Sequence, residues 1–234
     1  MHMSSENKVS IVCITYNHIE YIKDALEGIM NQKTTFKFNV FVFDDASTDG
    51  TSDIVAQYAK MYPDIVNAVI SPVNTYNNPD RKRILASLYE RFLTGKYIAV
   101  CEGDDCWINV YKLQKQVDFL ENNKECSMVT HAYRLLDCTN NTFSEIRLKE
   151  MDGYLSPKEV ILYPRGPLGT ASLVMRRDVF FEKKGFPKCD VGDIPIHFRA
   201  IQMGKVYYLD ELMSVYRYMH EGSCSREMTS NVDR

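Results

Sequence analysis

The sequence lacks a run of apolar residues long enough to cross a membrane, and it lacks an excess of basic charge. Its longest apolar runs, such as Phe41–Phe43 and Tyr97–Cys101, have the length of strands, whereas a spanning helix needs about 20 apolar residues. The 28 Lys and Arg residues stand against 31 Asp and Glu residues, which gives a formal net charge of −3. Proteins that bind nucleic acid through its phosphates usually carry a basic face. We therefore expect neither a membrane span in this chain nor a nucleic-acid partner.

Closely spaced pairs of disulfide-forming or zinc-binding residues are missing as well. The seven cysteines are an odd number without a C-x-x-C pair, and no two of the five histidines are spaced like zinc ligands. The first residues contain no apolar leader segment. These absences predict reduced cysteines that serve mainly in packing, in a cytoplasmic protein.

The first half of the chain alternates apolar strands with amphipathic helices. Runs typical of strands buried on both faces occupy Val9–Thr15, Asn39–Phe43, Ile65–Ile70 and Tyr97–Cys101. Segments with helical spacing of apolar residues follow each of them, and Asn17 stands where the N-cap of the first helix is expected. Repeated strand–helix–strand units predict an α/β fold, with a mostly parallel central sheet that helices cover on both faces.

Polar side chains follow directly after three of these strands, at Tyr16-Asn17, Asp44-Asp45 and Glu102–Asp105. In open α/β sheets ligands bind beyond the carboxyl ends of the strands, so we expect these residues to meet at one edge of the sheet. Because no lysine or arginine stands among them, the sequence predicts a concentrated negative patch at this edge. Oxygen ligands of this kind favour Mg²⁺ or Mn²⁺, whose coordination is often completed by substrate phosphates.

The chain after residue 126 is less regular, but it shows no clear linker and no internal repeat. We expect strands at Met128–Leu135 and Thr170–Met175, a helix over Arg176–Lys184, a second helix from Asp193 onward, and strand pairs within Lys205–Tyr218. One domain is therefore a better interpretation than two.

Segments spread along the whole chain resemble those of a known family. VSIVCITYN, VFDDASTDGT and GKYIAVCEGDDCW, followed by GTASLVMRRDVF and YRYMHEGSCS, are similar in order and spacing to family 2 glycosyltransferases of the GT-A fold. The resemblance covers about residues 8–225. It implies a single Rossmann-like domain over residues 1–234, in which residues 8–125 bind a nucleotide sugar and a smaller portion, residues 126–225, faces the acceptor.

The resemblance also implies an activity. Such enzymes move a sugar from a nucleoside-diphosphate donor, here expected to be a UDP-sugar, to a hydroxyl of a glycan or lipid-linked acceptor, with inversion at the anomeric carbon. We expect a role in the synthesis of a bacterial surface polysaccharide or lipopolysaccharide, with peripheral contact at the inner face of the cell membrane.

Individual residues take their expected roles from the same resemblance. Tyr16 would pack on the nucleotide base, although a ring at this position can also serve in packing, and Asp45 would bond to the uracil or ribose. Arg81 and Arg83 are both candidates for the diphosphate, although they would otherwise form a solvated helix face, and Arg83 is the one we include. The predicted donor-binding set is Thr15, Tyr16, Asn17, Asp45, Arg83, Glu102 and Asp104.

The expected metal ligands and catalytic base complete this site. Asp104 and Asp105 of the E-G-D-D segment, with His220 from the C-terminal loop, would hold Mn²⁺ or Mg²⁺, while Glu102 acts through water. Asp193 occupies the place of the family's general base, which removes the proton from the attacking hydroxyl; without the resemblance, an N-cap of the following helix is an equally good interpretation of this residue.

Two other functions remain open at this point. The chain could be a nucleotide-sugar-binding module without catalysis. FDDAST also resembles the D-x-D-x-T motif of haloacid-dehalogenase-like phosphohydrolases, although Ala46 replaces the second Asp and the motif follows the second strand instead of the first.

Overall fold

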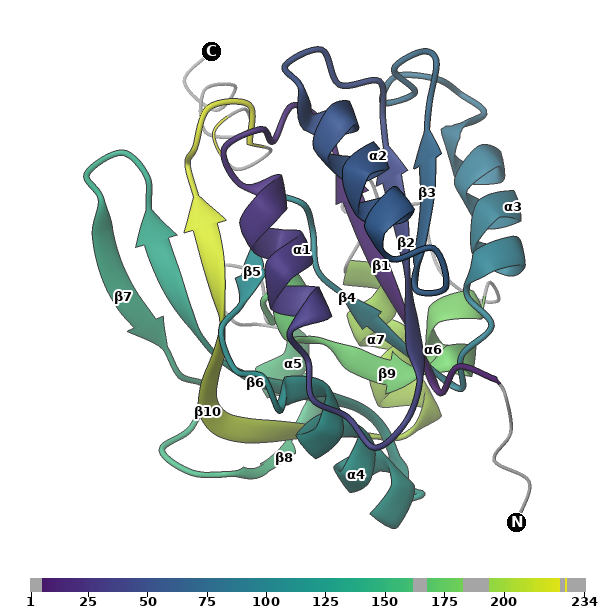
Figure 1. Ribbon diagram of the computed structural model, residues 1–234. Helices are drawn as coiled ribbons and strands as arrows, with labels where there is room; N and C mark the ends of the chain where they lie inside the picture. The colour runs from purple at the N-terminus through teal and green to yellow at the C-terminus, as the bar shows by residue number, and fades with distance from the viewer. Residues whose placement is uncertain (1–5, 162–167, 183–193, 224–225, 227–234) are drawn as a thin grey trace.

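The computed structural model describes residues 6–161, 168–182, 194–223 and 226 (Figure 1). Within them, a ten-stranded sheet has the order β3-β2-β1-β4-β9-β6-β10-β5, with β7 paired to β6 and β8 paired to β10. Its strands are β1 (Val9–Thr15), β2 (Phe38–Asp44), β3 (Val66–Ile70), β4 (Tyr97–Val100), β5 (Cys106–Trp107), β6 (Cys126–Asp137), β7 (Thr142–Ile146), β8 (Gly153–Leu155), β9 (Val174–Arg176) and β10 (Lys205–Tyr218).

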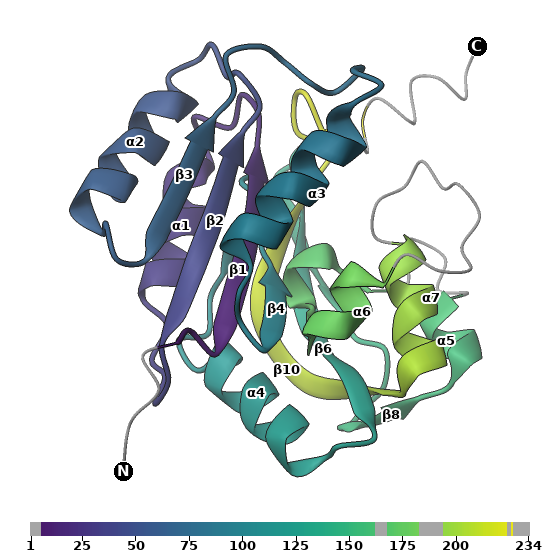
Figure 2. The same ribbon diagram turned by 90° about the vertical axis from the view of Figure 1, so that its right-hand side faces the viewer.

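Helices cover both faces of this sheet, as Figure 2 shows edge-on. One apolar cluster joins α1, α2 and α4 to one face, and a second joins α3, α5, α6 and α7 to the other. The helices are α1 (Ile22–Met30), α2 (Thr51–Met61), α3 (Arg81–Phe92), α4 (Lys112–Asn122), α5 (Pro157–Ile161), α6 (Arg177–Phe181) and α7 (Ile194–Met203), with a 3₁₀ turn η1 (Thr170–Ser172).

The strands β3, β2, β1 and β4 are parallel, and the first three end at the same level, whereas β4 ends at Val100 opposite Val12 and the chain continues beside β1 as far as the hydrogen bond between Gly103 and Ile14. Thr15 pairs with Asp44, and Asp44 pairs with Ile70, so the last residues of three neighbouring strands lie side by side. Strand β9 then joins β4 to β6 through antiparallel pairs, and β6 runs parallel to β10. The predicted α/β fold with a mostly parallel central sheet is confirmed.

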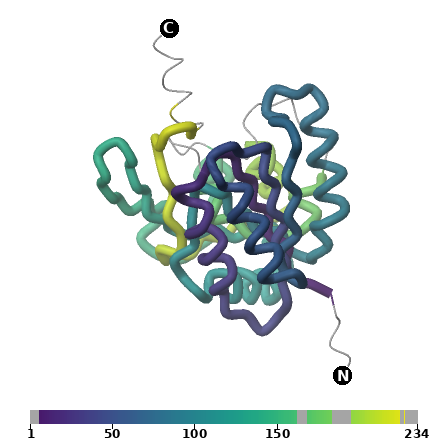
Figure 3. The backbone as a smooth tube through the Cα atoms, turned by 45° about the horizontal axis from the view of Figure 1, so that its top comes forward, coloured from purple at the N-terminus to yellow at the C-terminus, as the bar shows by residue number. Residues whose placement is uncertain are grey.

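The end of β10 returns to the edge at which the first strands end. Figure 3 brings this edge forward and shows the yellow segment after β10 beside the purple loop after β1. The ring centroids of His18 and His220 lie 5.6 Å apart there. Residues from both ends of the chain therefore contribute to one site.

Several predicted boundaries differ from the observed ones. Asn17 is not an N-cap: α1 begins at Ile22, and Asn17 has a positive φ of 53°, which lets it bridge two loops instead. The strand predicted over Thr170–Met175 is split into η1 and β9. The strand pairs predicted within Lys205–Tyr218 form one long strand, whose register against β6 shifts between Leu209 and Ser214. None of the described helices is both long and apolar enough to span a bilayer.

A buried polar cluster fixes α4 against the sheet. Lys112 is fully buried, its Nζ donates to Gln116 Oε1 at 2.9 Å, and it lies 4.1 Å from the centroid of the Trp107 ring. Gln116 Nε2 donates in turn to the carbonyl oxygens of Val129 and Ser172. Burial lowers the pKa of Lys112 to about 7, so the fold carries an ammonium group at a cost whenever the pH falls below that value.

Stability should therefore rise with pH through Lys112. In the unfolded chain this lysine keeps its proton up to about pH 10.5, whereas in the folded chain it loses the proton above about 7, so the unfolded state binds more protons between these values. From pH 7 to 8.5 the free energy of unfolding should increase by roughly 1–2 kcal/mol more in the wild type than in Lys112→Met. Urea denaturation at each pH measures this. Lys115→Met, on the exposed side of α4, should keep the wild-type slope, and equal slopes for Lys112→Met and the wild type would contradict the prediction.

Candidate active site

The loop after β1 is joined to the loop after β2 by several hydrogen bonds. The backbone N–H of Asn17 donates to Ser47 Oγ at 2.8 Å, and the backbone N–H of Thr48 donates to Asn17 Oδ1 at 2.8 Å. The backbone N–H of His18 donates to Thr51 Oγ1 at 2.9 Å. Between these bonds the side chain of Tyr16 remains 44% exposed, so its ring is accessible to a ligand.

The two aspartates after β2 have different surroundings. Asp44 is fully buried and accepts hydrogen bonds from the hydroxyls of Ser47 and Ser52. Asp45 is also buried: its Oδ1 accepts from the backbone N–H and Oγ1 of Thr75, at 2.7 and 2.8 Å, and its Oδ2 forms an ion pair with Arg81. Both carboxylates are thus satisfied by protein groups.

Arg81, and not Arg83, reaches the strand ends. Arg83 is 81% exposed and faces Asp80 at 3.4 Å, away from Asp45. Residues two apart on a helix point to opposite sides, so only one of the two arginines can face the sheet edge. The structure thus brings Arg81 to the acidic patch and leaves Arg83, the arginine included in the predicted set, on the exposed face of α3.

Residues Glu102–Asp105 form an acidic turn that is pressed against the end of β1. The backbone N–H of Gly103 donates to the carbonyl of Ile14 at 2.9 Å. A Cβ on Gly103 would lie 2.5 Å from Thr15 Oγ1 and 3.0 Å from His18 Nδ1, so a larger residue would push the turn away. The absence of a side chain at this position brings the Asp104 carboxylate close to His18.

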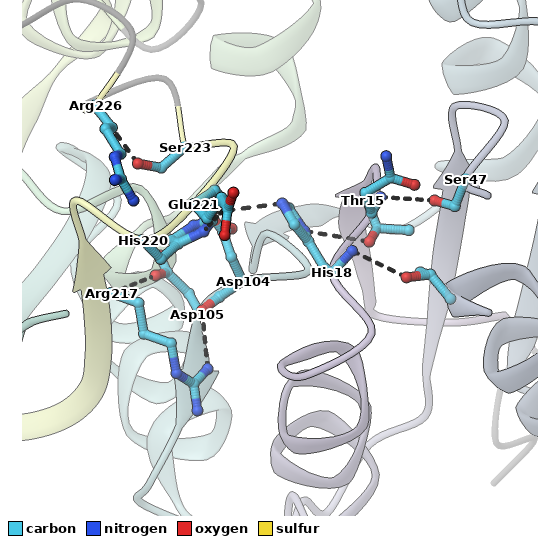
Figure 4. Close-up of polar contacts among 12 residues, drawn as sticks. Thr15, His18, Ser47, Asp104, Asp105, Arg217, His220, Glu221, Ser223 and Arg226 are labelled. Atoms are coloured by element: carbon cyan, nitrogen blue, oxygen red, sulfur yellow. Dashed lines mark hydrogen bonds and ion pairs between the residues drawn. The ribbon is translucent and has the colours of Figure 1, made fainter. Parts of the chain in front are cut away.

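Asp104 meets two histidines from distant parts of the chain (Figure 4). His220 Nε2 lies 2.8 Å and His18 Nε2 lies 3.9 Å from Asp104 Oδ2, and one donor atom from each residue lies within 4.8 Å of the others. We call these residues the imidazole–carboxylate cluster. The spacing of histidines along the chain does not point to His18. Its place directly after Tyr16-Asn17, in the loop that follows β1, is the sequence signal that could have identified it.

The charges of this cluster are coupled. Both ring nitrogens of His220 face acceptor oxygens, Asp104 Oδ2 and the carbonyl of Glu221 at 2.9 Å. Burial acts to lower the pKa of His220, but the hydrogen bond to Asp104 outweighs it and the pKa is raised. For Asp104, burial acts to raise the pKa, and the hydrogen bond from His220 with the charges of both histidines lowers it overall. Burial lowers the pKa of His18.

This donor set fits a divalent cation. Two imidazole nitrogens and one carboxylate oxygen suit Mn²⁺ and other first-row transition metals better than Mg²⁺, which prefers oxygen ligands. The side chain of Asp104 is 19% exposed, so a cation can approach it. Asp104 and His220, both predicted as ligands, are brought together, and His18 joins them.

Asp105 lies outside this cluster. It is buried, its Oδ1 accepts from the backbone N–H of Arg217 at 3.1 Å, and its Oδ2 has no hydrogen-bond partner among the described residues. Burial, and then the charges of Asp104 and Glu102, raise the pKa of Asp105 well above its usual range. The structure does not bring Asp105 to the two histidines of the cluster, and its role as a metal ligand stays a prediction. Glu102 is half-buried in the same turn, and Asp193 lies outside the described residues, directly before α7.

The sequence model of the family described as "Glycosyl transferase family 2" matches residues 10–183. The chain belongs to this family. It is 33% identical over 209 residues to the uncharacterised protein Rv1520 of Mycobacterium tuberculosis, and the match covers 89% of this chain and 58% of that relative. The chain thus spans little more than half the length of this curated relative.

Solved structures of glycosyltransferases share the fold. S. aureus TarS 1-349 in complex with UDP-GlcNAc superposes with a TM-score of 0.67 at 18% identity, over 94% of this chain and 60% of that one. The mannosyltransferase PcManGT from Pyrobaculum calidifontis, in complex with GDP-Man and Mn²⁺, superposes with a TM-score of 0.66 at 21% identity, over 94% and 59%. This member of glycosyl transferase family 2 therefore has the GT-A fold.

The two arginines of α3 offer a matched test of the site in this family 2 member. Arg81→Met should lower the free energy of unfolding by about 2–3 kcal/mol, because it leaves the Asp45 carboxylate buried without its ion-pair partner. Arg83→Met should change it by less than about 0.5 kcal/mol, since this side chain is exposed. Urea denaturation at pH 7 measures both, and equal effects would contradict the placement of Arg81.

Proposed function

We propose that this glycosyltransferase inverts the anomeric configuration while it moves a sugar from a UDP-sugar to a hydroxyl of a glycan or lipid-linked acceptor. The observation that carries the proposal is the imidazole–carboxylate cluster of His18, Asp104 and His220, whose His18 lies in the same loop after β1 as the exposed Tyr16. The bacterial envelope acceptor rests on the resemblance in sequence alone.

The donor would bind to the first half of the chain, residues 8–125. The ring of Tyr16 would stack on the nucleotide base, with Asn17 and Thr15 shaping the loop around it. Because Asp45 is already engaged by Thr75 and Arg81, we propose that it acts on the donor mainly by holding Arg81. A guanidinium has five N–H donors, and those not directed at Asp45 and Thr75 can serve the diphosphate.

Asp104, His220 and His18 would hold the divalent cation. The cation, Mn²⁺ in the first instance, would act as a Lewis acid that stabilises the charge on the departing nucleoside diphosphate. The Mn²⁺ named with PcManGT supports this choice. Glu102 would act from the same turn through water.

Asp193 would be the general base of the acceptor side, residues 126–225. A carboxylate within hydrogen-bond reach of the acceptor hydroxyl takes its proton as the oxygen attacks the anomeric carbon. A single displacement of this kind inverts the configuration and needs no covalent intermediate with the enzyme.

The phosphohydrolase alternative has little support. It would need Asp44 as nucleophile, but this carboxylate is fully buried and accepts hydrogen bonds from Ser47 and Ser52. The alternative of a binding module without catalysis differs from the proposed enzyme in one measurable respect, because it would bind the nucleotide sugar without transferring the sugar.

Donor binding and catalysis should separate at Asp193. Thermal shift against UDP, GDP and dTDP, each with and without Mn²⁺, identifies the nucleotide, and the matching sugar donors are then assayed for transfer across an acceptor panel. Asp193→Asn should lower the rate of transfer by roughly 10²–10⁴-fold, because the base is lost, and change nucleotide affinity by less than about twofold. Asp178→Asn, an exposed aspartate in α6, should leave both unchanged. Retained turnover in Asp193→Asn would exclude it as the base, and nucleotide binding without transfer in the wild type would favour a binding module.

The cation site should prefer Mn²⁺ to Mg²⁺ through its imidazoles. Asp104→Asn should weaken Mn²⁺ binding at least about 10-fold, and His18→Phe should remove the preference for Mn²⁺, because it deletes a nitrogen ligand. Isothermal titration with each metal measures this, with the exposed Asp118→Asn of α4 as a control. Unchanged Mn²⁺ affinity in both site variants would exclude the proposed ligands.

A further inference from the structure

Arg217, near the end of β10, is a buried basic side chain to which the predicted site gives no role. Its side chain is 9% exposed, and its planar guanidinium makes two separate hydrogen bonds. NH1 donates to the backbone carbonyl of Asp104 at 2.8 Å, and NH2 donates to Asp24 Oδ2 at 2.6 Å. The backbone N–H of the same residue donates to Asp105 Oδ1 (Figure 4). A single residue of β10 thus binds both aspartates of the acidic turn.

Aromatic packing fixes the guanidinium in this place. Its central carbon lies 5.0 Å from the centroid of the Tyr21 ring, at the start of α1. The centroid of the Tyr21 ring also lies 4.9 Å from the centroid of the His220 ring. The Tyr21 ring thus contacts both the guanidinium of Arg217 and the ring of His220, which belongs to the imidazole–carboxylate cluster.

We propose that Arg217 is a positioning residue for the cation site, an inference that rests on the proposed role of Asp104 as a ligand. The main chain of Asp104 is held by Arg217 on one side, and the neighbouring Gly103 is held by the carbonyl of Ile14 on the other. With its backbone fixed at both points, Asp104 directs its carboxylate toward His18 and His220.

The charge of Arg217 and its positioning role predict opposite changes in metal affinity when the residue is removed, so the direction of the change tests the proposal. A guanidinium next to a cation site repels the cation, so its removal should tighten metal binding if charge were its only influence. If Arg217 holds the turn, its removal should weaken metal binding, because a misplaced ligand costs affinity. The shape of the guanidinium matters as well. Its two nitrogens donate to two different residues, and the ammonium of a lysine, a point charge, cannot reproduce this arrangement.

The test compares Mn²⁺ binding, without nucleotide, to the wild type, Arg217→Met and Arg217→Lys. Electron paramagnetic resonance of free Mn²⁺ gives the dissociation constants, and thermal unfolding confirms that each variant is folded at the temperature of the titration. Both variants should bind Mn²⁺ about 10-fold more weakly than the wild type, as is typical when a partner that orients a metal ligand is lost. Arg147→Met, which removes an arginine that pairs with Asp210 and Glu145, should bind as the wild type does.

Each outcome decides one point. Tighter or unchanged binding in Arg217→Met would overturn the positioning role, even if its melting temperature falls. If Arg217→Met does not fold, the test rests on Arg217→Lys, which keeps the positive charge. Wild-type affinity for Mn²⁺ in Arg217→Lys would overturn the proposal. Failure of both variants to fold would overturn it as well. If the wild type binds no Mn²⁺, the cation site of the proposed function is wrong. If the wild type binds Mn²⁺ and the variants bind it equally well, only the positioning role of Arg217 is wrong.

Discussion

Parallel strands bring the carboxylates at and after their ends together, and this constraint shapes the rest of the molecule. Asp44 ends β2 and Asp45 follows it, while Asp104 and Asp105 lie in the turn after β4, with only β1 between these strands. Like charges so close to one another and largely out of water are unfavourable unless each is compensated. Asp44 is compensated by hydroxyls, Asp45 by Arg81 and Asp104 by His220, whereas burial and the charges of Asp104 and Glu102 raise the pKa of Asp105.

The compensating groups come from elements that are remote along the chain, and this explains much of the architecture. Helix α3 supplies Arg81 from one face of the sheet, the end of β10 supplies Arg217, and the segment after β10 supplies His220. The second half of the chain must therefore return to the strand ends of the first half before the acidic turn is satisfied. The site and the joining of the two halves depend on the same contacts.

The sequence could predict what depends on local pattern and on the general rule for parallel sheets. Apolar runs located β1 and β2 closely, and the rule for strand ends brought Asp45 and Asp104 to one edge. The choice between Arg81 and Arg83 was out of reach because α3 has no fully buried residue, so its apolar pattern fixes the orientation of the helix only weakly. The meeting of His18 with His220 depends on the path of β10, which no spacing along the chain reveals.

Solvent access separates the carboxylates that serve the fold from the one that can serve a ligand. Asp44, Asp45 and Asp105 are buried, and their partners are hydroxyls, an arginine or backbone N–H groups, none of which a cation can readily replace. Asp104 remains partly exposed, and its partner is the Nε2 proton of His220, on an imidazole that binds either a proton or a metal at the same atom. A cation can therefore take the place of that proton without leaving a buried charge unpaired. Of the four aspartates Asp44, Asp45, Asp104 and Asp105, only Asp104 combines exposure with an exchangeable partner, and this combination argues for Asp104 as the centre of the cation site.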